Sequence, residues 1–354
     1  MMLLLFAISC LLAIGVSAAS QQPLARPFAF DVQGHRGGRG NAIENTLPSF
    51  AWGLIDGATT LELDNGVTKD GVVVVWHDEQ IVASKCQDTA PAFSDDAAFP
   101  YVGKFIANLT LAQLKTLDCG SQRQSNFPLQ LTYPGTRIST LQEVFDFVEC
   151  ADTDHLIRWN IESKIDAAFP DRTVGVDVFV KNQHAIFDAS PYKDAITYQS
   201  FDWRSLIAMK KLDPTIITSA LVEHETAVTP DNTVSPWLGG LNLQNFSGSS
   251  LGVKLANAAH SINASILSPH ATYSPKSLAT KEMVDQAHYL GMLVKPWTVN
   301  SLDMADELLR WGVDGIITDY PNMVRRWVQQ QGRQVAPKYP KRRVLACLDE
   351  HSRW

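Results

Sequence analysis

Short apolar segments rich in β-branched residues alternate with amphipathic segments from about residue 32 to residue 321 of this chain. We expect strands in the apolar segments, at residues 28–34, 60–65, 72–76, 155–161, 195–199, 216–223, 264–268, 292–298 and 315–318. Repeated strand and helix is typical of a parallel α/β fold, because neighbouring parallel strands need a crossover connection that is usually helical. The length suits a closed TIM-type (β/α)8 barrel.

The nine expected strands exceed the eight places of such a barrel. The link between Asp64 and Val72 is too short for a helical crossover, so one strand of that pair is expected to be an added hairpin strand. An open doubly wound sheet is the alternative, and it normally carries a G-x-G-x-x-G turn after its first strand. Residues 34–40 lack that spacing and contain His35 and Arg36, which favours the barrel.

Several of the amphipathic segments carry helix start and stop signals. Thr140 and Glu143 form a capping box at the start of residues 141–150. Residues 301–311 have apolar side chains at helical spacing and are followed by Gly312, a common helix terminator. These signals predict helices between the strands, as the barrel requires.

The alternation lapses at residues 79–137, directly after the strand that leads to His77. This stretch contains Cys86 and Cys119 and is too long for a plain loop in a compact domain. We expect an irregular insertion that is either a lid over the site or a disulfide-pinned surface decoration.

The chain begins with an apparent secretory signal peptide. Residues 1–19 form an apolar run that ends in small residues and is followed by polar ones. Because the run is short for a membrane span, we expect cleavage, secretion and no stable membrane span. The expected organisation is then a barrel domain at 20–330 and a C-terminal tail at 331–354, with a solvated basic stretch from Lys338 to Arg343.

Cysteine usage agrees with an oxidising compartment. One of the five cysteines leaves with the signal peptide, and an even number stays, namely Cys86, Cys119, Cys150 and Cys347. Cys86 and Cys119 are the preferred pair because they flank one irregular stretch, although sequence alone leaves other connectivities open. Sequons for N-glycosylation fit the same route and occur at Asn108, Asn245 and Asn263.

Composition and charge restrict the partners of the chain. With 45% hydrophobic residues the chain can bury a large core. The net charge of −7 argues against a nucleic-acid binder, which needs a basic face. We therefore expect no nucleic-acid partner.

Acidic and imidazole side chains gather between residues 33 and 78. Glu62 and Asp64 stand at alternate positions of an expected strand, so they project from the same face. Two neighbouring carboxylates repel each other, and a hard divalent cation is the usual remedy. His35 and His77 follow two apolar segments and could supply the acid and the base that phosphodiester cleavage needs. We interpret this stretch as a phosphate site with a metal ion.

The same residues resemble the opening motifs of the glycerophosphodiester phosphodiesterase family. The matching motifs are His35-Arg36-Gly37, Glu44-Asn45-Thr46, Glu62 with Asp64, Thr68-Lys69-Asp70-Gly71 and His77-Asp78. Later landmarks of the family resemble residues 160–164, 199–202, 296–300 and 312–321. The resemblance covers about residue 32 to residue 321.

The resemblance implies a role for each matching residue. Glu62, Asp64 and Glu162 would hold one Mg²⁺ or Ca²⁺ through carboxylate oxygens. His35 and His77 would exchange roles as general base and general acid. The substrate-binding residues would be Arg36 and Lys164 at the phosphate and Trp297 beside the glycerol. The supporting residues would be Glu44 and Asn45.

Some residues near these motifs are given a lesser role. His270 is a weak candidate for the rim of the site, and Asp314 and Asp319 are expected only to cap a strand end. Asn65-Gly66 departs from the family, in which an apolar or β-branched residue is usual, and is expected to loosen the backbone beside Asp64.

The implied reaction is hydrolysis of a glycerophosphodiester to glycerol 3-phosphate and an alcohol. One alternative is phospholipase D-type activity on a lysophospholipid, as in related toxins. A second alternative is a catalytically silent surface-binding module, against which the intact histidine pair and the three acidic residues argue.

Overall fold

The structure is a computed structural model that describes residues 29–229, 233–272 and 277–353. The expected signal peptide at residues 1–19 lies outside the described residues. Among the described residues, no helix combines the length and the apolar character needed to cross a membrane.

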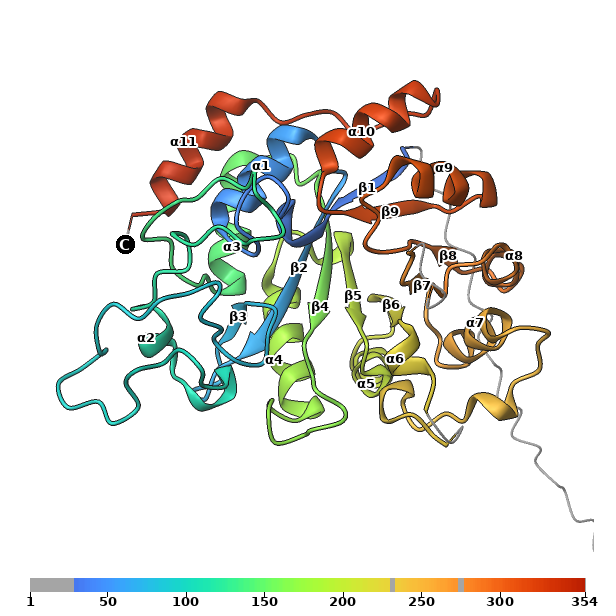
Figure 1. Ribbon diagram of the computed structural model, residues 1–354, viewed down its shortest axis with the longest axis horizontal. Helices are drawn as coiled ribbons and strands as arrows, with labels where there is room; N and C mark the ends of the chain where they lie inside the picture. The colour runs from blue at the N-terminus through green and yellow to red at the C-terminus, as the bar shows by residue number, and fades with distance from the viewer. Residues whose placement is uncertain (1–28, 230–232, 273–276, 354) are drawn as a thin grey trace, which may run out of the picture.

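Eight parallel strands form a nearly closed barrel with helices around it (Figure 1). The strands are β1 (Asp31–Gly34), β2 (Thr60–Val67), β4 (Arg158–Ser163), β5 (Ile196–Ser200), β6 (Ile217–Val222), β7 (Ile266–Pro269), β8 (Leu293–Val294) and β9 (Gly315–Thr318). Hydrogen-bonded neighbours follow the order β8-β7-β6-β5-β4-β2-β1-β9. The seam between β8 and β9 is bridged where the Asp314 N–H donates to the Val294 carbonyl (2.9 Å) and the Ile317 N–H donates to the Pro296 carbonyl (3.0 Å). The barrel prediction is confirmed, and the open sheet is excluded.

The added strand is β3 (Val73–Val75), which pairs antiparallel with the C-terminal half of β2. Thr68 and Gly71 close the turn between them: the Gly71 N–H donates to the Thr68 carbonyl (2.9 Å), and Gly71 has φ 82°. This left-handed conformation favours glycine. The ninth strand is therefore a hairpin arm on β2, which carries the chain on to His77.

The backbone at Asn65-Gly66 is not loosened, contrary to expectation. Asn65 is buried, and its amide accepts a hydrogen bond from Gln183 Nε2 (2.9 Å) and donates to the Val74 carbonyl (3.3 Å). Gly66 pairs with Val74 in the hairpin. Strand pairing and these side-chain bonds therefore hold the backbone beside Asp64.

Helices connect most of the strands. They are α1 (Leu47–Asp56), α3 (Leu141–Ala151), α4 (Val176–Ala189), α5 (Trp203–Leu212), α6 (His224–Ala227), α7 (Leu251–Ser261), α8 (Lys281–Tyr289), α9 (Leu302–Trp311) and α10 (Pro321–Gln330). Short 3₁₀ turns occur at η1 (His35–Gly37), η3 (Lys193–Ala195), η4 (Pro236–Leu238) and η5 (Leu243–Asn245). The predicted capping box at Thr140 is formed with Glu143, and Gly312 ends α9 in the left-handed conformation.

The insertion at residues 79–137 folds around a small core shared with β3. It contains η2 (Ile106–Asn108) and α2 (Leu111–Leu114), and it lies beside β3 in Figure 1. The buried side chains of this core are Val74, Trp76, Ile81, Cys86, Tyr101, Ile106, Leu109, Leu114, Leu117, Cys119 and Ile138. Cys86 and Cys119 form a disulfide, so the preferred pairing is confirmed. The insertion is therefore a disulfide-pinned unit built onto the hairpin arm.

The expected tail at residues 331–354 is in part a packed helix. Helix α11 (Lys341–His351) lies against α1 and α3 (Figure 1) and buries Val344, Cys347 and Leu348 in the main core. A second disulfide joins Cys347 to Cys150 at the end of α3. The apolar face and the disulfide explain why this segment is not a free tail. The basic residues of the stretch Lys338–Arg343 are exposed, as expected.

Candidate active site

His35 leaves β1 through a tight left-handed turn. Arg36 has φ 52° and Gly37 has φ 88°. A Cβ atom on Gly37 would lie 2.3 Å from Ser49 Oγ, so a larger residue does not fit. The Ser49 hydroxyl donates to the Arg36 carbonyl (2.6 Å) and fixes the turn. His35 thereby reaches the wall of a cavity at the C-terminal ends of the strands, where barrel enzymes place their chemistry.

Asp319, which directly follows β9, holds the His35 ring. His35 Nδ1 lies 2.6 Å from Asp319 Oδ1, and Arg39 Nε (2.7 Å) and Asn300 Nδ2 (2.6 Å) donate to the same carboxylate. Burial opposes ionisation, but His35 and Arg39 lower the pKa of Asp319 to about 2. An ionised carboxylate only accepts hydrogen bonds, so the proton of a neutral His35 ring is on Nδ1. Asp319 therefore does more than cap a strand end, contrary to expectation.

Three buried carboxylates meet beside His35. Glu62 and Asp64 come from β2, and the strand register places Glu162 of β4 beside Asp64. Ligand oxygens of the three lie within 4.8 Å of one another. Burial and the carboxylates of Asp64 and Glu162 raise the pKa of Glu62 well above its usual value, and burial together with Asp64 raises the pKa of Glu162 to about 7. A cation at this point would relieve the repulsion.

The donor set of this acidic cluster fits a hard divalent cation. Asp64 Oδ1 is buried and accepts no hydrogen bond from the residues that the structure describes. The Lys164 ammonium lies 3.3 Å from it and 2.7 Å from Glu162 Oε1. Burial opposes ionisation, but Lys164 and Arg36 hold the pKa of Asp64 well below its usual value. Carboxylate oxygens without sulfur or imidazole are the ligands that Mg²⁺ and Ca²⁺ prefer.

Neighbouring polar groups orient the acidic cluster. The Arg36 N–H (2.7 Å) and Gln199 Nε2 (2.8 Å) donate to the two oxygens of Glu62. Asn45 Nδ2 donates to Asp64 Oδ2 (2.8 Å). Each of these donors supports an ionised carboxylate and fixes its rotamer. Asn45 thus lies beside the acidic cluster, as expected of a supporting residue.

Arg36 and Glu44 form a buried ion pair beside the same cavity. Arg36 Nη1 lies 2.8 Å from Glu44 Oε1, and Arg36 Nε lies 3.2 Å from Asp64 Oδ2. Burial opposes protonation, but Glu44 and Asp64 raise the pKa of the guanidinium, so it stays charged. Arg36 lines the cavity together with Lys164, so two cations face it.

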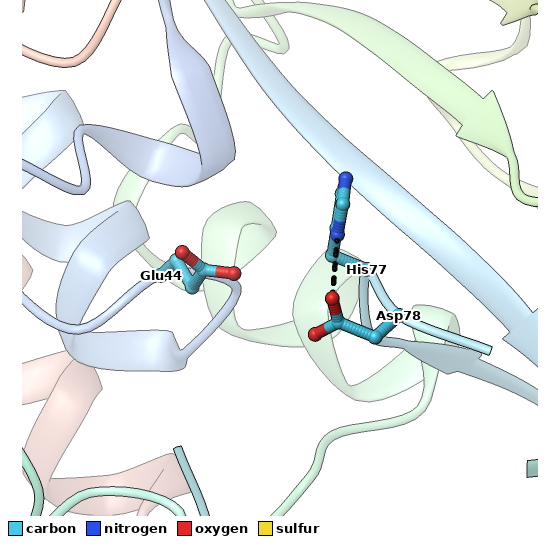
Figure 2. A group of neighbouring side chains, drawn as sticks. All are labelled: Glu44, His77 and Asp78. Carbon is cyan, nitrogen blue, oxygen red and sulfur yellow. Dashed lines mark hydrogen bonds and ion pairs between the residues drawn. The ribbon is translucent and has the colours of Figure 1, made fainter. Parts of the chain in front are cut away.

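His77 follows β3 and reaches the same cavity from the hairpin arm. Its Nδ1 lies 3.2 Å from Asp78 Oδ1, and the second ring nitrogen points away from Asp78 (Figure 2). The His77 side chain is 28% exposed, against 8% for His35. Burial, Arg36 and Lys164 lower the pKa of His77 to about 3, so its ring is neutral near pH 7. Burial and Arg36 also lower the pKa of His35.

Glu44, His77 and Asp78 form a second group of close ligand atoms (Figure 2). A lysine ammonium already balances the negative charge of this group. Lys85 Nζ, from the insertion, lies 2.7 Å from Glu44 Oε1 and 2.5 Å from Asp78 Oδ2. Because the ammonium neutralises the two carboxylates between which a metal ion would bind, we do not assign a metal site there.

The cavity has a volume of about 320 Å³, and part of its wall is apolar. Trp297, Phe201 and Trp237 line it, and the Trp297 and Phe201 rings meet edge to face with centroids 5.3 Å apart. His270 lies behind Trp297, with ring centroids 4.9 Å apart. Trp297 therefore belongs to the wall, whereas His270 supports it.

The structure brings almost all of the predicted site residues to one place. The residues that line the cavity are His35, Arg36, Glu62, His77, Glu162, Lys164 and Trp297, while Asp64, Glu44 and Asn45 lie directly behind them. Sequence reasoning missed Lys85 and Trp237 and undervalued Asp319. Asp319 had a signal in the closing motif, whereas Lys85 and Trp237 lie outside every motif.

The strand ends of this parallel barrel bring two imidazoles, an acidic cluster and two cations to one cavity. This combination defines the class of phosphodiester-cleaving barrel hydrolases. The chain belongs to the glycerophosphoryl diester phosphodiesterase family, whose sequence model matches residues 35–323.

Three comparisons show what the chain is similar to in sequence or in fold. A glycerophosphodiester phosphodiesterase from Caldanaerobacter subterraneus subsp. tengcongensis is 27% identical over 298 residues, which cover 84% of this chain and 97% of that protein. The crystal structure of a Silicibacter pomeroyi protein assigned to the same family has a TM-score of 0.70 at 28% identity and covers 88% of this chain and 96% of its own. A phosphodiesterase from Oleispira antarctica, solved with the product sn-glycerol 3-phosphate, has a TM-score of 0.61 at 20% identity and covers 85% and 98%.

Proposed function

We propose that this enzyme hydrolyses glycerophosphodiesters to glycerol 3-phosphate and an alcohol, with His35 and His77 as general acid and base. One observation carries the proposal: both imidazoles line the cavity that contains the acidic cluster, and each has its Nδ1 beside a carboxylate. With the proton on Nδ1, each Nε2 is able to accept a proton.

The chain's own residues supply the proton transfers and the charge. Both rings are neutral in the free protein, because burial and neighbouring cations lower their pKa values. A bound phosphodiester anion would offset Arg36 and Lys164, so one ring could take up a proton. That ring then protonates the leaving alcohol oxygen while the other accepts a proton from the nucleophile, which is either water or a hydroxyl of the substrate. In the second case water then opens the cyclic phosphate, and the two rings exchange roles. Arg36 and Lys164 face the cavity and compensate the charge of the phosphate.

We infer that Glu62, Asp64 and Glu162 hold one divalent cation, Mg²⁺ or Ca²⁺. When bound, such a cation polarises a phosphate oxygen and stabilises the negative charge that develops there. The raised pKa values of Glu62 and Glu162 support this inference, because a cation would replace the protons that these acids otherwise retain.

Chelation and product analysis test the proposed function. Purified enzyme is assayed on a panel of glycerophosphodiesters after treatment with EDTA, and then with Mg²⁺ or Ca²⁺ added back. We expect turnover to disappear with the chelator, to return with one of the two metals, and to yield glycerol 3-phosphate. Unchanged activity after chelation contradicts the cation, and binding without any product favours the silent module.

A lysophospholipid is the second candidate substrate. The aromatic wall of Phe201, Trp237 and Trp297 offers apolar surface beside the phosphate site, which suits the stem of a lipid. Adding lysophospholipid vesicles to the same panel separates the candidates. We expect faster turnover of the water-soluble diesters, because cations and acidic groups line the cavity as well.

We also propose that the protein is secreted and carries glycans. The disulfides and the exposure of the predicted glycosylation sites, Asn108, Asn245 and Asn263, support this proposal. N-terminal sequencing of secreted protein and a mass shift on enzymatic deglycosylation test it. An intact N-terminus or an unchanged mass would reject the corresponding part.

A further inference from the structure

The carboxylate that orients His77 is held by a lysine from outside the barrel. Asp78 Oδ1 lies beside His77 Nδ1 (3.2 Å), and Asp78 Oδ2 receives a hydrogen bond from Lys85 Nζ (2.5 Å). The same ammonium donates to Glu44 Oε1 (2.7 Å). Lys85 therefore bridges the loop after β1 and the residue that follows His77.

Lys85 is itself fixed by the small core of the insertion. The next residue, Cys86, is buried and joined to Cys119. One residue further, Gln87 and Asp118 exchange two backbone hydrogen bonds (2.9 and 3.1 Å). The Lys85 ammonium lies 5.6 Å from the centroid of the Trp76 ring. With 14% of its side chain exposed, Lys85 is in a constrained position and not a flexible surface cation.

We propose that Lys85 is a positioning residue for His77. By holding Asp78 Oδ2 it keeps Asp78 Oδ1 against the imidazole, which retains the proton on Nδ1 and leaves Nε2 to exchange protons in the cavity. Without the ammonium, Asp78 is free to rotate toward solvent, since its side chain is 27% exposed. The His77 ring would then lose both its orientation and its tautomer preference.

The barrel provides a parallel for this arrangement. Around His35, Arg39 donates to Asp319, and Asp319 contacts His35 Nδ1. Each histidine thus has a carboxylate on Nδ1 and a cation on that carboxylate. The cation comes from the motif region in one case and from the insertion in the other.

The test compares three variants with the wild type, all loaded with Mg²⁺. Lys85→Met removes the ammonium at similar size, and Lys85→Arg keeps a cation. Lys115→Met is the matched control, because Lys115 belongs to the same insertion and pairs with Glu143 (2.5 Å), away from the cavity. Thermal unfolding confirms that each variant is folded, and steady-state kinetics on a glycerophosphodiester separates kcat from KM.

We expect Lys85→Met to lower kcat by about tenfold with little change in KM, because the imidazole is misplaced while the phosphate contacts stay. Lys85→Arg should recover most of the loss, and Lys115→Met should leave kcat unchanged. Wild-type kcat in Lys85→Met, or an equal loss in Lys115→Met, would overturn the assignment.

A spectroscopic measurement makes the result independent of turnover. Long-range ¹H–¹⁵N spectra report which ring nitrogen of each histidine carries the proton, and a His77→Gln variant assigns the His77 signals. We expect the Nδ1–H form for His77 in the wild type and in Lys85→Arg, and a mixture in Lys85→Met. An unchanged tautomer in Lys85→Met overturns the inference. This inference rests on the proposed function; if no diester is turned over, that function fails while the tautomer result still stands.

Discussion

The two histidines of this site are supported by two different parts of the molecule. His35 is supported by the barrel: Asp319 lies 284 positions away in sequence but on the adjacent strand end, and its contact with Nδ1 is short (2.6 Å). His77 is supported by the hairpin arm and the insertion, through Asp78 and Lys85, with a longer contact (3.2 Å). The His77 side chain is also more exposed.

This difference separates what the fold fixes from what the insertion adds. Strand ends of a parallel barrel occupy one rim, so His35, Asp319 and the acidic cluster are placed by hydrogen bonds of the sheet. His77 depends on a stretch whose path is set by its own small core and disulfide. Changes in the insertion should therefore reach His77 and leave the barrel half of the site intact.

Removal of either imidazole should have the largest effect on kcat, although the two rings are held by different parts of the molecule. His35→Ala and His77→Ala should each lower kcat by about 100- to 10,000-fold, since general acid–base catalysis contributes that much. Steady-state kinetics measures the loss, and thermal unfolding shows that the variants are folded. His184→Ala is a matched control, because His184 of α4 pairs with Asp213, which directly follows α5 (3.3 Å). A small loss in one variant alone would show that only one histidine transfers a proton.

Asp319 and Asp78 each orient a histidine. Substitution of the carboxylate that is held more firmly should cause the larger loss in kcat. In Asp319→Asn, the amide places an N–H group opposite Arg39, Asn300 or His35, all of which are donors, so the His35 tautomer is disfavoured. We expect a loss in kcat of about 100-fold there and about tenfold for Asp78→Asn, whose contact is longer and more exposed. Kinetics at saturating substrate measures both.

Asp213→Asn provides a control for this ranking, because it alters a histidine–carboxylate pair outside the site. Its kcat should equal that of the wild type. A larger loss for Asp78→Asn than for Asp319→Asn would reverse the comparison between the two halves.

Much of the barrel was predictable because its signals are local. β9 has the predicted bounds, and β5 and β6 differ from prediction by one residue at each end. The added strand could not be chosen from sequence, because both segments have strand patterns and only the pairing of β2 and β3 shows which one is added. Helix α11 was missed for a related reason: it buries few side chains, and its partners α1 and α3 lie far away in sequence.

The residues of the candidate site also separate into those that local sequence signals predict and those that they do not. Residues of the motifs lie at strand ends, and strand ends meet, so Glu62, Asp64 and Glu162 were predictable as a group. The contact of Asp319 with His35 requires knowledge that β9 neighbours β1. Lys85 has no local signal, because its position depends on the irregular path of the insertion. Sequence therefore predicted the groups that line the cavity better than the groups that orient them.

The two disulfides should separate activity from stability. Cys86→Ser with Cys119→Ser frees the segment that carries Lys85, so we expect kcat to fall by about tenfold. Cys150→Ser with Cys347→Ser frees α11 and should leave kcat unchanged. Each loss should lower the free energy of unfolding by about 2–5 kcal/mol. Denaturant unfolding and kinetics on the same samples check both. Equal effects on kcat would show that the insertion has no special link to His77.

A further prediction, which leaves kcat aside, concerns the acidic cluster, which belongs wholly to the barrel half. Burial and Asp64 raise the pKa of Glu162 to about 7 in the metal-free protein, above its ordinary value of 4.5. The folded protein therefore retains a proton, and the stability that this proton contributes is present below pH 4.5 and lost as the pH rises through about 7.

A cation that binds there must displace that proton. Mg²⁺ affinity should consequently increase with pH between pH 5 and 7, by up to about tenfold per pH unit for each proton displaced. Isothermal titration calorimetry across this range measures the slope, and Glu162→Gln should reduce it, because the proton on Glu62 is still displaced. Lys85→Met should retain the wild-type slope, since Lys85 contacts Glu44 and Asp78 and belongs to the insertion. A slope that changes with Lys85 would mean that the insertion also controls the acidic cluster, and the division between the two halves of the site would fail.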